Sequence, residues 1–139
     1  MSILQEMHFD SELLTVVARG EFSLEEAKRA FLEILGAVTR YQPEKVLLDG
    51  RNLKGKPADI DRFYFSRFAA EETMRLVNEN RIRLPRFAYV LHEPVRDPER
   101  FGETVAVNRG MIAKTFETPE EAFVWLEITP PNRPDASDA

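Results

Sequence analysis

The alternation of short β-like runs with amphipathic helical patterns constrains the fold of this sequence more than any other feature. Two β-like runs, near residues 3–9 and 13–20, come first, and the three polar residues between them suit a hairpin turn. Helical and strand-like patterns then alternate as far as residue 128. The order β-β-α-β-α-β-α-β-α predicts a single α/β domain, in which about four helices cover a mixed five-stranded sheet, mostly parallel after the first strand.

Capping residues mark where two of the predicted helices begin. Ser23 and Glu26 form a capping box that opens the first helix. Thr118 is a predicted N-cap for the last helix, with Pro119 at the first helical position and Glu121 at the third. The apolar residues of the first helix repeat at helical spacing, which indicates an amphipathic helix laid on a sheet: Leu24, Ala27, Phe31, Ile34, Leu35 and Val38.

Apolar runs and helix-breaking residues predict the elements in between. "KVLLDG" indicates a buried strand that closes on Asp49 and Gly50, and "RNLKGKPAD" indicates a loop. We expect a second helix from about residue 59 or 61 to residue 78 or 80. The other expected elements are a strand in "RFAYVLHE", a short helix in "FGETVAVNRG" closed by Gly110, and a strand in "MIAKTFET".

Composition excludes several classes of protein. The chain of 139 residues suits one domain, which we place at residues 1–128, and the proline-rich residues 129–139 are expected to form a disordered tail. There is no cysteine, so disulfides and thiolate sites are excluded. A net charge of −5 argues against nucleic-acid binding. With no long apolar run and no basic N-terminal region, we expect a cytoplasmic protein without a signal peptide or membrane span.

The stretch "DRFYFSRF" at residues 61–68 carries more aromatic rings than one buried helix face can hide. A helix turns about 100° per residue, so Phe63, Tyr64 and Phe65 spread over roughly 200° of its circumference. The stretch also lies in the one basic region of the chain, since residues 51–86 hold nine basic and five acidic residues. We therefore expect some of these rings to face a ligand, a partner chain or a membrane.

No motif predicts an enzyme, a cofactor or a metal site. Asp49 and His92 follow two predicted strands and could form an acid/base pair, but we favour structural roles for both. His8 and His92 have no metal-ligand spacing, and no nucleophile elbow or dinucleotide-binding glycine motif occurs. The expectation is a non-enzymatic protein.

Three segments, "KVLLDG", "FGETVAVNRG" and "AKTFETPEEAFVWL", resemble in order and spacing the SpoIIAA-like family of small bacterial proteins with a STAS/SEC14-like fold. The similarity covers nearly all of residues 3–128. It implies one α/β domain, related to anti-sigma-factor antagonists and to lipid-carrying domains. It also implies binding of an apolar or amphipathic ligand, opening of a helix and membrane association, with no established enzyme activity.

The two relatives make different demands on the sequence. An anti-sigma antagonist is switched by phosphorylation of a Ser or Thr where the helix after the central strand begins. This chain has neither residue type from Tyr41 through Phe65, which argues against such a switch. A lipid carrier needs a movable amphipathic element over an apolar cavity, and the predicted second helix fits that demand, with Gly50, Gly55 and Pro57 in a hinge-like loop before it.

These observations favour a non-enzymatic binding protein for a small apolar or amphipathic, lipid-like ligand, with a movable aromatic helix and peripheral association with the inner face of a membrane. The alternatives are a STAS-type protein-interaction module acting as a homodimer or with a regulatory partner, and an ordinary packed core. The predicted ligand-binding residues are Phe63, Tyr64, Phe65, Phe68, Asp49 and His92. The predicted contacts to an anionic head group or partner are Arg62, Arg67 and Arg51.

Overall fold

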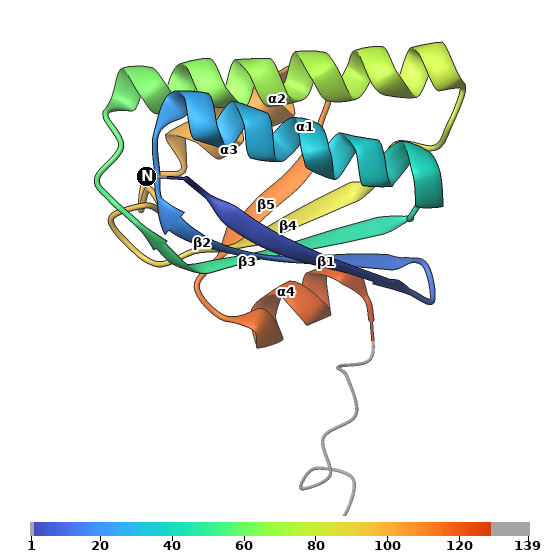
Figure 1. The fold of residues 1–139 in the computed structure, drawn as a ribbon, viewed down its shortest axis with the longest axis horizontal. Helices are drawn as coiled ribbons and strands as arrows, with labels where there is room; N and C mark the ends of the chain where they lie inside the picture. Colours follow the sequence, from blue (N-terminus) through green and yellow to red (C-terminus); the bar gives the residue numbers. More distant parts are fainter. Residues whose placement is uncertain (1, 129–139) are drawn as a thin grey trace, which may run out of the picture.

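A computed structural model describes residues 2–128 of the chain, in which one five-stranded sheet is covered by helices on both faces (Figure 1). The predicted tail at 129–139 lies outside the described residues. Helices α1, α2 and α3 lie on one side of the sheet and α4 lies on the other (Figure 1). The elements are β1 (Leu4–Asp10), β2 (Leu13–Glu21), α1 (Leu24–Tyr41), β3 (Lys45–Lys54), α2 (Asp59–Asn80), β4 (Arg86–Val90), α3 (Phe101–Asn108), β5 (Ile112–Phe116) and α4 (Pro119–Leu126).

The sheet has the strand order β1-β2-β3-β4-β5, so each strand pairs with its neighbours in the sequence. β1 and β2 form the predicted antiparallel hairpin, and β2, β3, β4 and β5 pair in parallel. The predicted α/β architecture, with a mostly parallel mixed sheet and four helices, is therefore confirmed. Parallel pairing also brings the carboxyl ends of β2 to β5 to one edge of the sheet, where ligands of open α/β sheets commonly bind.

The predicted helix starts are found where the capping residues place them. The Ser23 hydroxyl accepts a hydrogen bond from the Glu26 backbone N–H at 3.2 Å, and the Thr118 hydroxyl accepts one from Glu121 at 3.3 Å. The capping box of α1 is only half formed, because the Glu26 carboxylate accepts the backbone N–H of Ile3 at 2.9 Å instead. This bond ties the start of β1 to the start of α1.

Two strand ends differ from the prediction. β3 continues to Lys54 rather than closing on Asp49 and Gly50, because β2 continues beside it after a register shift and offers partners up to the pair Glu21 and Lys54. β4 ends at Val90, three residues earlier than expected, since its ladder with β5 ends at the pair Val90 and Phe116. Partners distant in the sequence therefore set both limits.

The core has two layers, one on each face of the sheet. On one face of the sheet α1 buries a continuous apolar stripe, and on the other α4 seals a second cluster. α2 packs against α1 and α3 rather than directly on the strands, and it runs along the outer side of this layer (Figure 1). The α4 cluster contains Leu47, Ala88, Val90, Phe116, Ala122, Phe123 and Leu126.

Candidate functional site

An apolar cavity of about 160 Å³ lies between the sheet and the helices α1, α2 and α3. Its walls come from all three of these helices, from all five strands and from Ile3 just before β1. Most of the surface is hydrocarbon. The larger apolar side chains of the lining are Ile3, Phe22, Phe31, Ile34, Leu48, Leu53, Phe65 and Leu91.

Small residues on the facing walls explain why this space is left unfilled. Ala30 of α1, Ala69 of α2 and Ala106 of α3 all line the cavity and are buried. Alanine side chains fill little of the gap between elements, and interiors are otherwise close-packed. α2 stands over this gap, and its one large inward ring, Phe65, meets Phe31 edge to face at a centroid distance of 5.9 Å.

The polar part of the lining is concentrated near the carboxyl ends of β4 and β5. Arg62 comes from the first turns of α2, Asp97 and Arg100 from the segment between β4 and α3, and Glu103 from α3 itself. Thr115 follows at the end of β5. The cavity is therefore polarised, with a hydrocarbon body and one charged end.

The two acids at this end are already engaged by backbone donors. The Asp97 carboxylate accepts the N–H of Glu99 at 3.0 Å and that of Phe101 at 2.9 Å. Desolvation acts to raise the pKa of Asp97, but these two N–H groups and the charges of Arg62 and Arg96 hold the pKa below its ordinary value. Glu103 accepts the N–H of Thr115 at 2.7 Å and its hydroxyl at 3.2 Å.

Several polar atoms of the lining have no partner among the described residues. The Nε of Arg62 is buried without an acceptor, although its terminal nitrogens donate to the Pro94 carbonyl at 2.5 Å and to Asp59 at 3.2 Å. The Oε1 of Gln5 is also buried and unpartnered. Burial strongly raises the pKa of Tyr89, which also lines the cavity. Buried polar atoms without a partner are rare, so Arg62 and Gln5 are candidates for polar contacts with a ligand.

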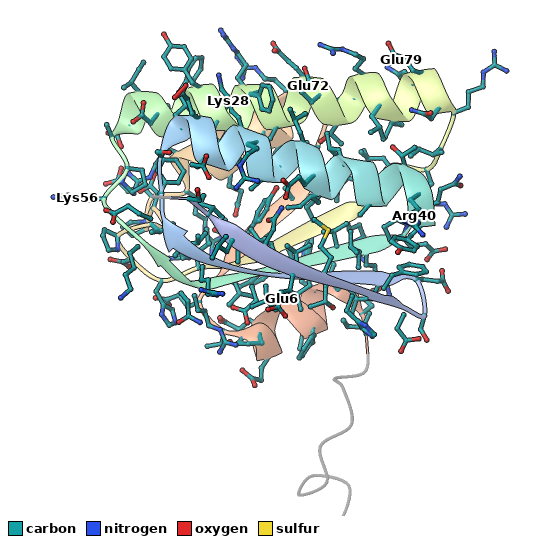
Figure 2. All side chains as sticks on the ribbon, in the orientation of Figure 1. Glu6, Lys28, Arg40, Lys56, Glu72 and Glu79 are labelled. Atoms are coloured by element: carbon teal, nitrogen blue, oxygen red, sulfur yellow. The ribbon has the colours of Figure 1, made fainter. Side chains whose placement is uncertain are left out.

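The four rings of "DRFYFSRF" separate into three environments. Phe65 lines the cavity. Phe63 and Tyr64 lie on another side of α2, where Phe63 stacks on Phe101 at 6.5 Å and the Arg67 guanidinium lies 5.6 Å and 5.5 Å from the two ring centroids. The fourth ring, Phe68, is partly buried under the Lys28 ammonium at 5.2 Å, and Figure 2 shows Lys28 reaching from α1 toward α2. Of these four predicted ligand-binding rings, only Phe65 lines the cavity.

Asp49, Arg51 and His92 do not join the cavity lining. Along β3, side chains alternate between the two faces, and Leu47 packs under α4, so Asp49 and Arg51 belong to the α4 face. The Asp49 carboxylate accepts two Arg51 hydrogen bonds at 2.9 Å and 2.8 Å, and these bonds lower its pKa, opposed by desolvation. Any ligand role of these three residues stays a prediction, and it would concern a different surface from the cavity.

Sequence reasoning missed the polar residues around the cavity other than Arg62. Asp97, Arg100 and Glu103 follow β4, and the rule that ligands gather at the carboxyl ends of parallel strands could have drawn attention to them. No sequence signal marks Gln5 or Tyr89. Within residues 2–128, no three His, Asp or Glu side chains are grouped so that they could hold a metal ion, and no helix is both long and apolar enough to cross a membrane.

No protein-family model and no curated protein matches the chain. Among solved structures, an anti-sigma factor antagonist from Mycobacterium paratuberculosis is similar with a TM-score of 0.54 and 14% identity, over 91% of this chain and 95% of that one. An uncharacterized protein of the DUF3478 family with a SpoIIAA-like fold, from Shewanella loihica PV-4, gives a TM-score of 0.49 and 18% identity, over 90% and 94% of the two chains. The first likeness confirms the expected STAS-like fold.

Proposed function

We propose that this STAS-like domain is a non-enzymatic binding protein that holds a small apolar or amphipathic molecule in the cavity beneath α2. The observation that carries the proposal is the cavity itself, which is lined mainly by hydrocarbon and covered by the helix that packs least directly on the sheet. Largely apolar pockets with a few convergent polar groups are the usual form of small-molecule sites.

The volume of the cavity limits the size of the ligand. A cavity of about 150 Å³ lined by apolar side chains accepts benzene or xenon. With about 160 Å³, this cavity suits a single ring or a short chain rather than a long-chain lipid. A larger lipid requires α2 to move outward, which would break the bond from Arg62 to the Pro94 carbonyl. We propose that α2 is the movable element, with its hinge in the loop that holds Gly55 at φ +114°.

The proposal can be tested with toluene as a neutral probe, using ligand-observed NMR and thermal unfolding. Binding to the native state alone raises the unfolding temperature with probe concentration. The variant Ala69→Leu, which fills the cavity from α2, is expected to lose the effect, whereas Ala58→Leu, at an exposed position before α2, is expected to keep it. A folded wild-type protein that binds neither toluene nor any molecule recovered by organic extraction and native mass spectrometry would rule the function out.

The second candidate function is a STAS-type regulatory module that binds a protein partner or a second copy of itself. The comparison with an anti-sigma factor antagonist favours this candidate, and no comparison names a lipid ligand. A surface for it is available outside the cavity, where Tyr64 and Phe101 are 40% and 42% exposed beside Phe63 and Arg67. Aromatic and arginine side chains are enriched at protein interfaces.

The same exposed patch would serve a peripheral contact with anionic lipid head groups, through Arg67 and through Arg109, whose guanidinium lies 5.6 Å from the Phe63 ring centroid. Sedimentation of the protein alone and flotation with anionic vesicles separate these uses. A dimer that Tyr64→Glu dissociates supports the interaction module. Flotation that Arg67→Gln abolishes supports the membrane contact.

A further inference from the structure

The two edges of the sheet differ in how they are protected. At the β5 edge, Glu103 of α3 accepts the Thr115 N–H at 2.7 Å, and α3 packs against the strand. At the other edge, β1 pairs only with β2 among residues 2–128 (Figure 1). Open strand edges are templates for pairing with another chain, and proteins usually protect them with proline, lysine or a bulge. β1 has none of these over its seven residues.

The hairpin fixes which backbone groups of β1 point to the open edge. A two-residue turn with positive φ at both positions joins β1 to β2, so the closing pair Asp10 and Leu13 is hydrogen-bonded. Bonding alternates along an antiparallel ladder, so every second residue from Asp10 backwards bonds to β2. The N–H and C=O groups of Gln5, Met7 and Phe9 therefore point outward.

The start of this edge is already occupied by α1. Ile3, two residues before Gln5, donates its N–H to Glu26 at 2.9 Å, and its C=O accepts the Arg29 guanidinium at 2.6 Å. These bonds agree with the alternation, because they come from outside the sheet. Among residues 2–128, no comparable bond reaches the backbone of the next three outward-facing residues.

Both faces of β1 leave room for a second strand at this edge. Gln5 points toward α1, where its Nε2 donates to the Ala30 carbonyl at 2.9 Å, so Glu6 and His8 lie on the other face, and both are exposed. On the α1 side, an open hollow of about 330 Å³ lies between β1 and the last turns of α1. Its lining includes Met7, Phe9, Ala37 and Tyr41.

One antiparallel register of a second β1 uses all of the outward-facing residues. With a two-fold axis through Met7, Met7 lies opposite the partner's Met7 and Gln5 lies opposite the partner's Phe9, and each such pair can exchange two backbone hydrogen bonds. The same register sets Glu6 opposite the partner's His8 in a non-hydrogen-bonded pair, where side chains lie closest. The imidazole can donate an N–H to the carboxylate, and the symmetry repeats this pair.

The neighbouring registers are less favourable. An axis through Glu6 sets its carboxylate against the partner's Glu6, and it brings Ile3, whose backbone groups are taken, opposite the partner's Phe9. An axis through His8 sets Glu6 against the partner's Asp10, and like charges directly opposite one another are destabilising. The sequence "LQEMHFD" is therefore complementary to itself in one register.

On these grounds we propose that β1 is a self-recognition edge, through which two copies of the chain join their sheets by antiparallel β1 strands, with Met7 on the two-fold axis and Glu6 beside the partner's His8. The inference goes beyond the cavity function and does not depend on it. It also assigns self-association to a surface other than the aromatic patch of Tyr64 and Phe101. Pairing of one short strand is a small interface, so we expect a dimer that dissociates on dilution.

The test exchanges the two paired side chains and measures self-association of the full chain by sedimentation velocity, from about 10 μM to about 1 mM. His8→Glu sets like charges opposite one another on both sides of the axis, so it should weaken the dimer at least about tenfold. Glu6→His combined with His8→Glu rebuilds the pair with its members exchanged, and it should restore the dimer to within about threefold of wild type. Asn78→Glu adds the same charge at an exposed position of α2 and should change nothing.

Amide hydrogen exchange of the wild-type protein gives an independent measurement. The N–H groups of Gln5, Met7 and Phe9 should be protected at high concentration and exchange freely on dilution, whereas those of Glu6 and His8 stay protected by β2 at both concentrations. This pattern, together with rescue by the double variant, supports the proposal.

Four results would overturn it. They are a protein that stays monomeric throughout the range, outward N–H groups whose exchange does not depend on concentration, a double variant that associates no better than His8→Glu, and a dimer that Tyr64→Glu dissociates but His8→Glu does not. If the chain is monomeric and these N–H groups become protected only when another protein is added, the edge binds an extended segment of that protein and self-pairing is wrong.

Discussion

The two long helices, α1 and α2, use their sequences in opposite ways. α1 buries a stripe of large apolar side chains on the sheet, including Phe31, Ile34 and Leu35. α2 is longer, with 22 residues, yet its buried residues are all small: Ser66, Ala69, Ala70 and Thr73. The exposed residues in its second half are all polar, and Figure 2 shows Glu79 turned away from the sheet. α1 therefore anchors the fold, whereas α2 covers a cavity and is held mainly by neighbouring helices.

The difference predicts that shortening a core side chain costs far more on α1 than on α2. Leu35 is 3% exposed and does not line the cavity, so Leu35→Ala should lower the free energy of unfolding by about 3 kcal/mol. Leu76 on α2 is only half-buried, and Leu76→Ala should cost about 1 kcal/mol. Urea denaturation of both variants measures the contrast. Equal losses would show that α2 is anchored as firmly as α1.

Two glycines should respond to substitution with opposite signs. In α3, a Cβ at Gly102 would lie 2.7 Å from the Ser66 hydroxyl of α2, so Gly102→Val should force these helices apart and cost about 2 kcal/mol. In α1, a Cβ at Gly36 meets nothing within 4 Å, so Gly36→Ala should stabilise the protein by about 0.5 to 1 kcal/mol. Thermal unfolding of both variants compares them. If Gly102→Val is neutral, α2 already has the freedom to move away from α3.

The sequence predicts the limits of a helix or strand well when local interactions set them, and poorly when partners distant in the sequence do. α1 and α4 begin at Ser23 and Thr118, whose caps depend on residues three positions away, and such local signals are visible in one sequence. The end of β3 could not be predicted, because it depends on pairing with β2 more than 30 positions earlier. A strand limit of that kind is a tertiary property.

The candidate site also has features that the local sequence predicts and features that depend on residues distant in the sequence. The excess of rings in "DRFYFSRF" is a local property, and it correctly indicated that one face of α2 does not hold them all. Their sorting depends on distant partners, since Phe65 meets Phe31 and Phe63 meets Phe101.

The charged end of the cavity should make stability depend on pH through Asp97. The pKa of this group is lowered from its ordinary value of 3.8 in the folded protein, so the charged carboxylate stabilises the fold above that value. The contribution is lost as the pH falls through the lower, folded-state pKa. Asp97→Asn should therefore cost about 1 kcal/mol at pH 7, and the difference from wild type should vanish in acid. Urea denaturation at several pH values measures it. A penalty that is the same at every pH would show that the charge of Asp97 plays no part.

The smallest expected effect on stability belongs to the ring that α2 turns outward. Tyr64 is 40% exposed and contacts Phe63 and Arg67 on the surface, so Tyr64→Ala should change the free energy of unfolding by less than about 0.5 kcal/mol. It should also leave toluene binding unchanged, because Tyr64 does not line the cavity. A loss above about 1 kcal/mol would mean that the aromatic patch helps to hold α2 in place. Unchanged stability together with a lost dimer or partner would instead assign the patch to recognition, leaving Phe65 as the ring of "DRFYFSRF" that serves the cavity.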